Sequence, residues 1–209
     1  MIEFFLNYYH KLLGALLEHL ELVFVSLLCS LFLAALLTVF SMYSKTVSGL
    51  LIHLFSMIYS IPSLAMFAIL IPLTGLGRTT AVIVLTVYNQ YLLLRNFIAG
   101  LTGVDAAIVE AAAGMGMTTM QTLLRVRLPL AKSGLITGIR LSAVSTVGIG
   151  MIAAQVNAGG LGTVLFDGLR TMNIYKIIWG SILSAGLAIM LDVCLRGTNN
   201  NSDKVSGPP

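Results

Sequence analysis

The chain has 209 residues, of which 57% are hydrophobic and only 10% charged, and its mean hydropathy is +0.96. Because a soluble domain carries about 25% charged residues, this composition argues against a soluble fold and indicates an integral membrane protein. The formal net charge of +4, from 12 basic and 8 acidic residues, is too sparse for a nucleic-acid-binding surface, so we expect no nucleic-acid partner.

Long uncharged runs predict an all-α membrane protein with about five transmembrane helices, since each helix needs about 20 mainly apolar residues to cross the bilayer. The predicted spans lie at about 22–44, 51–73, 79–94, 133–166 and 176–195. The third span continues slightly beyond residue 94. The odd number of spans places the two termini on opposite faces of the membrane.

Polar segments flank this region and divide the chain into three parts. Residues 1–20 form an N-terminal extracytoplasmic or interfacial segment, in which Phe4–Leu20 is predicted to be a small amphipathic helix. Residues 21–196 form the transmembrane domain. Residues 197–209, with the sequence GTNNNSDKVSGPP, are predicted to be disordered.

The basic residues predict an orientation, because short cytoplasmic loops are enriched in lysine and arginine. If segment 103–130 is cytoplasmic, seven basic residues lie inside: Lys45, Arg95, Arg125, Arg127, Lys132, Arg196 and Lys204. Four then lie outside: Lys11, Arg78, Arg170 and Lys176. The bias favours a cell-membrane protein with its N-terminus outside and its C-terminus in the cytoplasm.

Segment 103–130, between the third and fourth predicted spans, contains the signals for two short helices. Asp105 is a suitable N-cap for a helix over residues 106–113, which have high helix propensity. Gly114 and Gly116 are expected to end that helix, because glycine is the usual residue just past a helix end.

A second short helix is predicted to begin at Thr118, where Thr118 and Gln121 have the spacing of a capping box. It should stop before Pro129, because the residue before a proline resists the helical conformation, and an extended Leu-Pro-Leu should lead back to the membrane. Helices this short are not stable alone in water, so both need a surface to pack on. An ordinary cytoplasmic loop with short surface helices is the alternative interpretation.

The segment EAAAGMGMTTMQTLLRVRLP resembles the EAA loop of ABC importer permeases, in which Glu-Ala-Ala precedes a glycine and, about twenty residues on, a Leu-Pro pair. The matching positions are Glu110, Ala111, Ala112, Gly114, Leu128 and Pro129. The resemblance implies a cytoplasmic coupling-helix loop that docks onto a separate ATPase. The implied coupling residues are Glu110, Ala111, Ala112, Gly114, Met115, Gly116, Arg125 and Pro129.

Within this loop, chemistry suggests a role for each implied contact. Small side chains at Ala111 and Ala112 let a partner surface approach closely, and Glu110 offers a charge to a basic group on the partner. Gly114 is expected to allow the sharp turn between the two helices.

Three further stretches resemble the osmoprotectant branch of these permeases, which handles glycine betaine, carnitine and choline. They are residues 59–77, 131–150 and 157–169. The resemblance implies import of such a compatible solute by alternating access; another small solute, such as an amino acid or a related betaine, is the alternative cargo. It also implies cytoplasmic ATP-binding subunits, a second identical or related permease chain and an extracytoplasmic solute-binding protein.

The sequence contains no P-loop and no Gly-Lys pair, so we expect a transporter subunit rather than an enzyme, with ATP and Mg acted on by the partner ATPase. Cys29 and Cys194 both lie inside apolar runs, and the histidines lack ligand spacing, so neither a metal site nor a bound cofactor is predicted. A stand-alone secondary transporter or channel is a rival hypothesis, but no inverted repeat is evident. A membrane-embedded enzyme is disfavoured because the spans contain no clusters of His, Asp and Glu.

Four polar residues are candidates for lining the substrate pathway: Tyr88, Asn89, Gln155 and Asn157. Intramembrane polar groups also hold helices together, and this alternative stays open for Tyr88 and Asn89. For Gln155 and Asn157 the alternative is the mouth that faces the receptor.

Two more residues are candidates for the gate or for coupling. Arg140 lies inside the fourth span, either as a functional charge or as an arginine whose guanidinium reaches the cytoplasmic boundary. Pro62 interrupts the second span, either as a hinge or as a tolerated kink or helix start. With one tryptophan, Trp179, and scattered tyrosines, no aromatic cage for a quaternary ammonium is visible in the sequence.

Overall fold

A computed structural model describes residues 2–42 and 44–203, and this part of the chain is helical with no β-strand. Four of its helices are long and apolar enough to cross a membrane, or five if one sharply bent pair counts as a single span. The prediction of an all-α membrane protein with about five spans is therefore confirmed.

The first helix, α1, runs unbroken from Ile2 to Ser41, so the prediction of a separate interfacial helix over Phe4–Leu20 is wrong. One buried stripe continues across the expected boundary, with Leu12, Ala15, His19 and Leu22 all nearly inaccessible at helical spacing. The same packing surface therefore holds both halves of α1. At 1.5 Å per residue its 40 residues extend about 60 Å, twice the thickness of the hydrocarbon layer.

The second predicted span is not one helix but two, α2 (Lys45–Tyr59) and α3 (Ser63–Thr74), which meet at a bend of 96°. Pro62 is the N-cap residue of α3, with φ −56° and ψ 132°. The sequence left open whether Pro62 is a hinge, a tolerated kink or a helix start, and in the structure it lies at a helix start. The chain breaks here because Pro62 has an extended backbone conformation, so α2 cannot continue through it.

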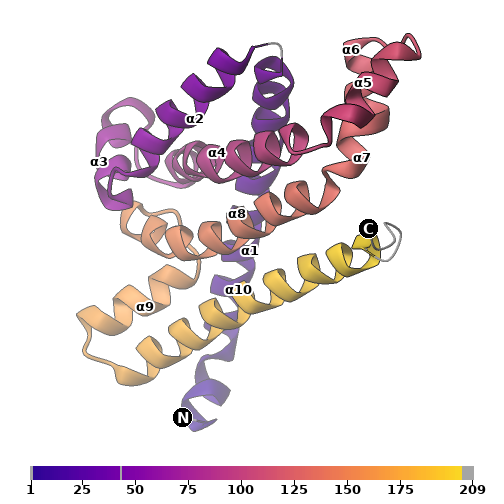
Figure 1. The fold of residues 1–209 in the computed structure, drawn as a ribbon. Helices are drawn as coiled ribbons and strands as arrows, with labels where there is room; N and C mark the ends of the chain where they lie inside the picture. Colours follow the sequence, from indigo (N-terminus) through magenta and orange to yellow (C-terminus); the bar gives the residue numbers. More distant parts are fainter. Residues whose placement is uncertain (1, 43, 204–209) are drawn as a thin grey trace.

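The remaining membrane helices are α4 (Arg78–Thr102), α8 (Lys132–Ile152) and α10 (Ile174–Asp203). A shorter helix, α9 (Leu161–Arg170), lies between α8 and α10 in the chain. Figure 1 shows α4, α8 and α10 side by side, and α1 crosses them. The contacts agree: α4 packs against α1 and α8, and α10 packs against α8 and α9.

The fourth predicted span, 133–166, ends earlier than expected. A short 3₁₀ segment, Ala153–Val156, follows α8, and Asn157, Gly159 and Gly160 then have φ of 62°, 79° and 82°. Such left-handed conformations end a helix, so the apolar run 141–166 is divided between α8 and α9.

The C-terminal helix is longer than predicted. It continues to Asp203, so the disorder expected from residue 197 is wrong up to that point, and residues 204–209 lie outside the described part of the chain.

The bundle has two distinct ends. At the α9 end, the backbone N–H of Gly160 donates to Glu18 in the first half of α1, and the ring of Phe4 stacks on that of Tyr175 at the start of α10. At the other end, which we call the loop end, the last residues of α1 meet the segment between α4 and α8. Helix α10 runs from the α9 end to the loop end, so the two ends of the described chain lie at opposite ends of the bundle (Figure 1).

Candidate functional site

The segment between α4 and α8 projects from the loop end of the bundle (Figure 1). It begins with α5 (Ala106–Gly114), and the Asp105 side chain accepts a hydrogen bond of 2.9 Å from the backbone N–H of Ala107. The predicted N-cap is confirmed. This bond satisfies one of the backbone donors that every helix start leaves open.

The turn after α5 depends on Gly116 rather than on Gly114. Gly114 is the last residue of α5 and is not among the residues with positive φ, whereas Gly116 has φ +79°. The prediction that Gly114 provides the sharp turn is therefore corrected. Within the described part of the chain, a Cβ added at Gly114 would meet no atom within 4 Å, so the packing there does not require glycine.

The second short helix, α6 (Thr119–Thr122), begins as predicted. Thr118 Oγ1 accepts from the N–H of Gln121 at 3.3 Å, and Gln121 Oε1 accepts from the N–H of Thr118 at 2.9 Å, which completes the capping box. The cap fixes where this part of the loop becomes helical.

The predicted stop before Pro129 and the extended Leu-Pro-Leu are wrong. A π-helical turn at Leu123–Arg127 follows α6 and leads into α7 (Leu128–Leu130), with Pro129 in its first turn. A proline is tolerated there because the N–H groups of the first turn have no partner within the helix. The loop thus passes into α8 through helical turns.

The predicted coupling residues differ in exposure. Glu110, Ala111, Gly114, Gly116, Arg125 and Pro129 are exposed, and Met115 is 75% exposed. Ala112 is only 2% exposed, so the prediction that both alanines face a partner is wrong for Ala112. The small side chain at 112 instead lets α5 pack against the chain itself.

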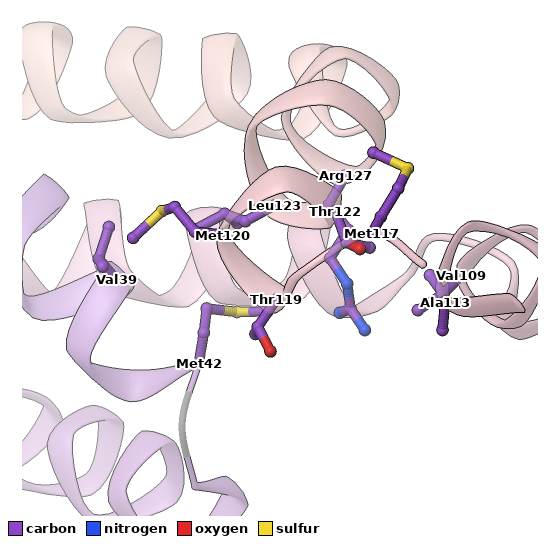
Figure 2. A pocket seen from close by; sticks show the side chains of 10 residues that line it. All are labelled: Val39, Met42, Val109, Ala113, Met117, Thr119, Met120, Thr122, Leu123 and Arg127. Carbon is purple, nitrogen blue, oxygen red and sulfur yellow. The ribbon is translucent and has the colours of Figure 1, made fainter. Parts of the chain in front are cut away.

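A cavity of about 190 Å³ lies between the end of α1 and the loop. Figure 2 shows Val39 and Met42 of α1 on one side, Val109 and Ala113 of α5 on the other, and the Arg127 side chain between them. The short helices therefore pack loosely on the end of α1.

Arg127 is a site residue that sequence reasoning counted only as a topology charge. Its Nη1 donates a hydrogen bond of 3.1 Å to the carbonyl oxygen of Leu101, in the last turn of α4. The last carbonyls of a helix have no partner within it, so Arg127 caps α4 and ties the loop to a membrane helix. Its position near the end of α4, 26 residues away, could not be deduced from the sequence alone.

Tyr88 and Asn89 lie within the bundle, far from the loop. The Tyr88 hydroxyl donates to the carbonyl oxygen of Ile61, at the break between α2 and α3. Asn89 Nδ2 donates to Ser30 Oγ of α1 at 3.1 Å and to Thr146 Oγ1 of α8 at 2.8 Å. Of the two hypotheses for these residues, the contacts favour the one in which they hold helices together.

Gln155 and Asn157 lie at the α9 end, where both are exposed and line a cavity of about 640 Å³. In the same cavity, Asp167 accepts bonds from Lys176 Nζ at 2.6 Å and from an Arg170 Nη at 3.1 Å. These hydrogen bonds, first that of Lys176 and then that of Arg170, lower the pKa of Asp167. This charged mouth is at the opposite end from Glu110, so the predicted pathway residues Gln155 and Asn157 lie apart both from the loop and from Tyr88 and Asn89 within the bundle.

Arg140 pairs with a residue that the sequence did not suggest. Its Nε lies 2.7 Å from Asp192 Oδ1, an ion pair between α8 and α10 in which both side chains are partly exposed. The pair offsets the cost of an arginine at this depth. In the described part of the chain, no three His, Cys, Asp or Glu side chains come together as a metal site would require.

The arrangement is an apolar bundle with a capped, projecting helix pair at one end and a charged mouth at the other. Residues 26–203 match the family described as "Binding-protein-dependent transport system inner membrane component". The chain belongs to this family. It is therefore a multi-pass permease subunit of the ABC importers, and not an enzyme.

Curated relatives cover most of the permease. The carnitine transport permease protein OpuCB of Listeria monocytogenes is 33% identical over 195 residues, which is 93% of this chain and 89% of the relative. The glycine betaine/carnitine/choline permease protein OpuCB of Bacillus subtilis is 33% identical over 181 residues, 87% of this chain and 83% of the relative. The carnitine permease protein OpuCD of L. monocytogenes is 39% identical over 152 residues, 72% of this chain and 68% of the relative.

Solved structures share the fold of the permease. A chain of the inward-facing MetNI methionine ABC transporter matches with a TM-score of 0.84 and 22% identity, over 94% of this chain and 98% of that chain. A chain of an amino acid ABC transporter matches with a TM-score of 0.79 and 16% identity, over 94% of this chain and 96% of that chain.

Proposed function

We propose that the permease moves a quaternary-ammonium compatible solute (glycine betaine, carnitine or choline) into the cell, driven by ATP hydrolysis on separate subunits. The observation that carries the cargo class is the identity of 33–39% to relatives named for carnitine, choline and glycine betaine transport. Alternating access is the expected mechanism, with a loaded receptor docking outside and ATP binding opening the cavity outward.

The projecting helices are proposed to be the contact with the ATPase. Glu110, Ala111 and Met115 are exposed there, and an added Cβ at Gly114 would meet no neighbour. Glycine at such an open position suits close approach by another protein. Movement of the docked helices would reach α4 through Arg127 and α8 through α7.

This contact also sets the proposed orientation. If the ATPase is cytoplasmic, the loop end lies inside, and the N-terminus and α9 lie outside. The charged mouth around Asp167, Gln155 and Asn157 would then face the solute-binding protein. Because five spans enclose only half of a pathway, a second permease chain, identical or related, is expected.

A different small solute is the second candidate. The ergothioneine transport permease/binding protein EgtU of Helicobacter pylori is 32% identical over 157 residues, 75% of this chain and 28% of the relative. Ergothioneine is itself a betaine of an amino acid, so this alternative keeps the charge class and changes the size of the cargo.

The test is uptake by the complete transporter in proteoliposomes. The permease, its ATPase and its receptor are reconstituted, and uptake of labelled glycine betaine, carnitine, choline and ergothioneine is measured with and without ATP. We expect ATP-dependent uptake of at least one of the first three. Uptake without ATP or receptor would contradict the importer assignment, and ATP-driven uptake of ergothioneine alone would favour the second candidate.

A further inference from the structure

Three tyrosines that are scattered in the sequence come together where α2 meets α4. The ring centroid of Tyr59 lies 5.1 Å from that of Tyr91 and 5.7 Å from that of Tyr88. The rings are tilted to one another, with interplanar angles of 37° and 59°. The cluster gathers negative π faces around the end of α2.

The Tyr59 side chain also lines a cavity of about 490 Å³ between α2, α4, α8 and α10. Leu92, Leu141 and Ala188 give this cavity a mainly apolar wall. Its polar groups come from Tyr59, Ser145 and Asp192. Its volume lies in the range of about 300–1,000 Å³ that is common for small-molecule sites.

Asp192 is the acidic group of this wall. One oxygen, Oδ1, pairs with Arg140 at 2.7 Å, and the carboxylate remains 34% exposed. The arginine is not among the residues that line the cavity. The cavity therefore presents a carboxylate and an aromatic ring, and the arginine that pairs with the carboxylate is not part of its lining.

We propose that this cavity is the subsite in the permease for the quaternary ammonium group of the cargo. The Tyr59 ring would contact the cation through its π face, and Asp192 would supply the opposite charge. The apolar wall suits the methyl groups of a quaternary ammonium. A hydrated ammonium without methyl groups would not need such a wall. This inference rests on the proposed cargo class and names the residues that would contact it.

The partial neutralisation of Asp192 matters for transport. A fully unpaired carboxylate would hold a cation tightly, whereas an ion-paired one adds only modest attraction. A pathway site has to release its cargo, so weak binding is what we expect.

Tyr91 already has a cation beside it. Arg95 Cζ lies 5.9 Å from the Tyr91 ring centroid, and Arg95 Nη1 donates to the Tyr91 hydroxyl at 2.9 Å. The two residues stand one turn apart on α4, so this contact lies within a single helix. Of the three tyrosines, Tyr59 is the one that lines the cavity, so the proposal places the cargo against its ring.

The test is direct binding to the permease–ATPase complex in lipid nanodiscs, without receptor or ATP. The probes are choline and its neutral carbon isostere 3,3-dimethyl-1-butanol, measured by saturation-transfer NMR. We expect choline to bind about ten-fold more tightly than the isostere, given the strength of cation–π contacts in partly desolvated sites. Equal binding of the two probes would overturn the proposal, because the cavity would then be a general apolar or lipid-filled space.

Variants locate the binding. Tyr59→Leu should weaken choline binding about ten-fold, while Tyr59→Phe, which keeps the π face, should retain it within about two-fold. The matched control is Tyr175→Leu, which removes an exposed tyrosine at the α9 end and should leave choline binding unchanged. Wild-type binding in Tyr59→Leu would contradict the assignment of the site.

Complex assembly, followed by size-exclusion chromatography, separates loss of the site from loss of the fold. If Tyr59→Leu does not assemble, Asp192→Asn provides a second measurement, and we expect it to weaken choline binding but not binding of the neutral isostere. If Asp192→Asn weakens the binding of choline and of the neutral isostere equally, the proposed attraction between the carboxylate and the cation is contradicted.

The uptake assay keeps this inference distinct from the proposed function. If the transporter imports a quaternary ammonium solute but choline binding does not depend on Tyr59, the subsite is wrong and the cargo class stands. If choline binds at Tyr59 but only an unrelated solute is imported, the cargo class is wrong and the cavity chemistry stands.

Discussion

The guanidinium of Arg127 caps α4 from the projecting loop, with 3.1 Å between its Nη1 and the carbonyl oxygen of Leu101. The same side chain lines the cavity between α5 and the end of α1 (Figure 2). One residue thus contacts a membrane helix and faces the loosely packed base of the loop. Arg127 is thus a polar link between the proposed ATPase contact and the bundle.

Loss of this link should destabilise the loop end. We expect Arg127→Ala to lower the free energy of unfolding by about 1–2 kcal/mol, because a partly buried, charge-assisted hydrogen bond is lost. The measurement is denaturant unfolding of the purified protein in detergent. The exposed Arg125→Ala is the control and should change stability by no more than about 0.5 kcal/mol. An equal loss in both variants would show that the Leu101 contact is not the cause.

The two loop glycines should respond differently to substitution. Gly116→Ala should destabilise the protein by about 1 kcal/mol, because φ +79° is unfavourable for a residue with a Cβ. Gly114→Ala should not destabilise the protein, since the added Cβ meets no atom of the described residues within 4 Å. Gly114→Trp should abolish co-purification with the ATPase although the permease still folds. Normal ATPase binding by Gly114→Trp would remove Gly114 from the proposed contact.

Asn89 should contribute to helix packing. Its side chain is 1% exposed and donates hydrogen bonds to both α1 and α8. Asn89→Ala should therefore lower the free energy of unfolding by about 1–2 kcal/mol, because two hydrogen bonds within the membrane are lost and each contributes about 0.6 kcal/mol or more. Thermal unfolding in detergent measures the loss. Asn96→Ala is the matched control, because the Asn96 amide donates to the Leu92 carbonyl of its own helix. A larger effect of the control would contradict a role of Asn89 between helices.

The charged mouth should show a defined pH dependence. Because Lys176 and Arg170 lower the pKa of Asp167 from its ordinary 3.8, the folded state holds this proton less tightly than the unfolded chain. The contribution of Asp167 to stability is therefore present above pH 3.8 and is lost as the pH falls through the lower folded-state pKa. Wild type should unfold at a higher temperature than Asp167→Asn at pH 6–7, and the difference should shrink below pH 3.8. A difference that grows on acidification would contradict this sign.

The sequence by itself determined features that depend on local chemistry. The caps at Asp105 and Thr118 join residues two or three positions apart, and such contacts follow from residue order alone. Membrane insertion also follows from sequence, because it depends on the apolar length of each run. The match of the loop to an importer family rests on spacing within about twenty residues.

Only the tertiary structure decided the contacts between helices. Ala112 faces the chain rather than a partner because α5 packs against α6 and the π-helical turn of the same loop, and Arg127 reaches Leu101 because the loop folds back on α4. Tyr59 and Tyr91 stand 32 residues apart, and they meet because α2 breaks at Pro62 and packs on α4. A side chain's distant partners depend on how whole helices cross, so the cavity that Tyr59 lines could not be predicted from residue order.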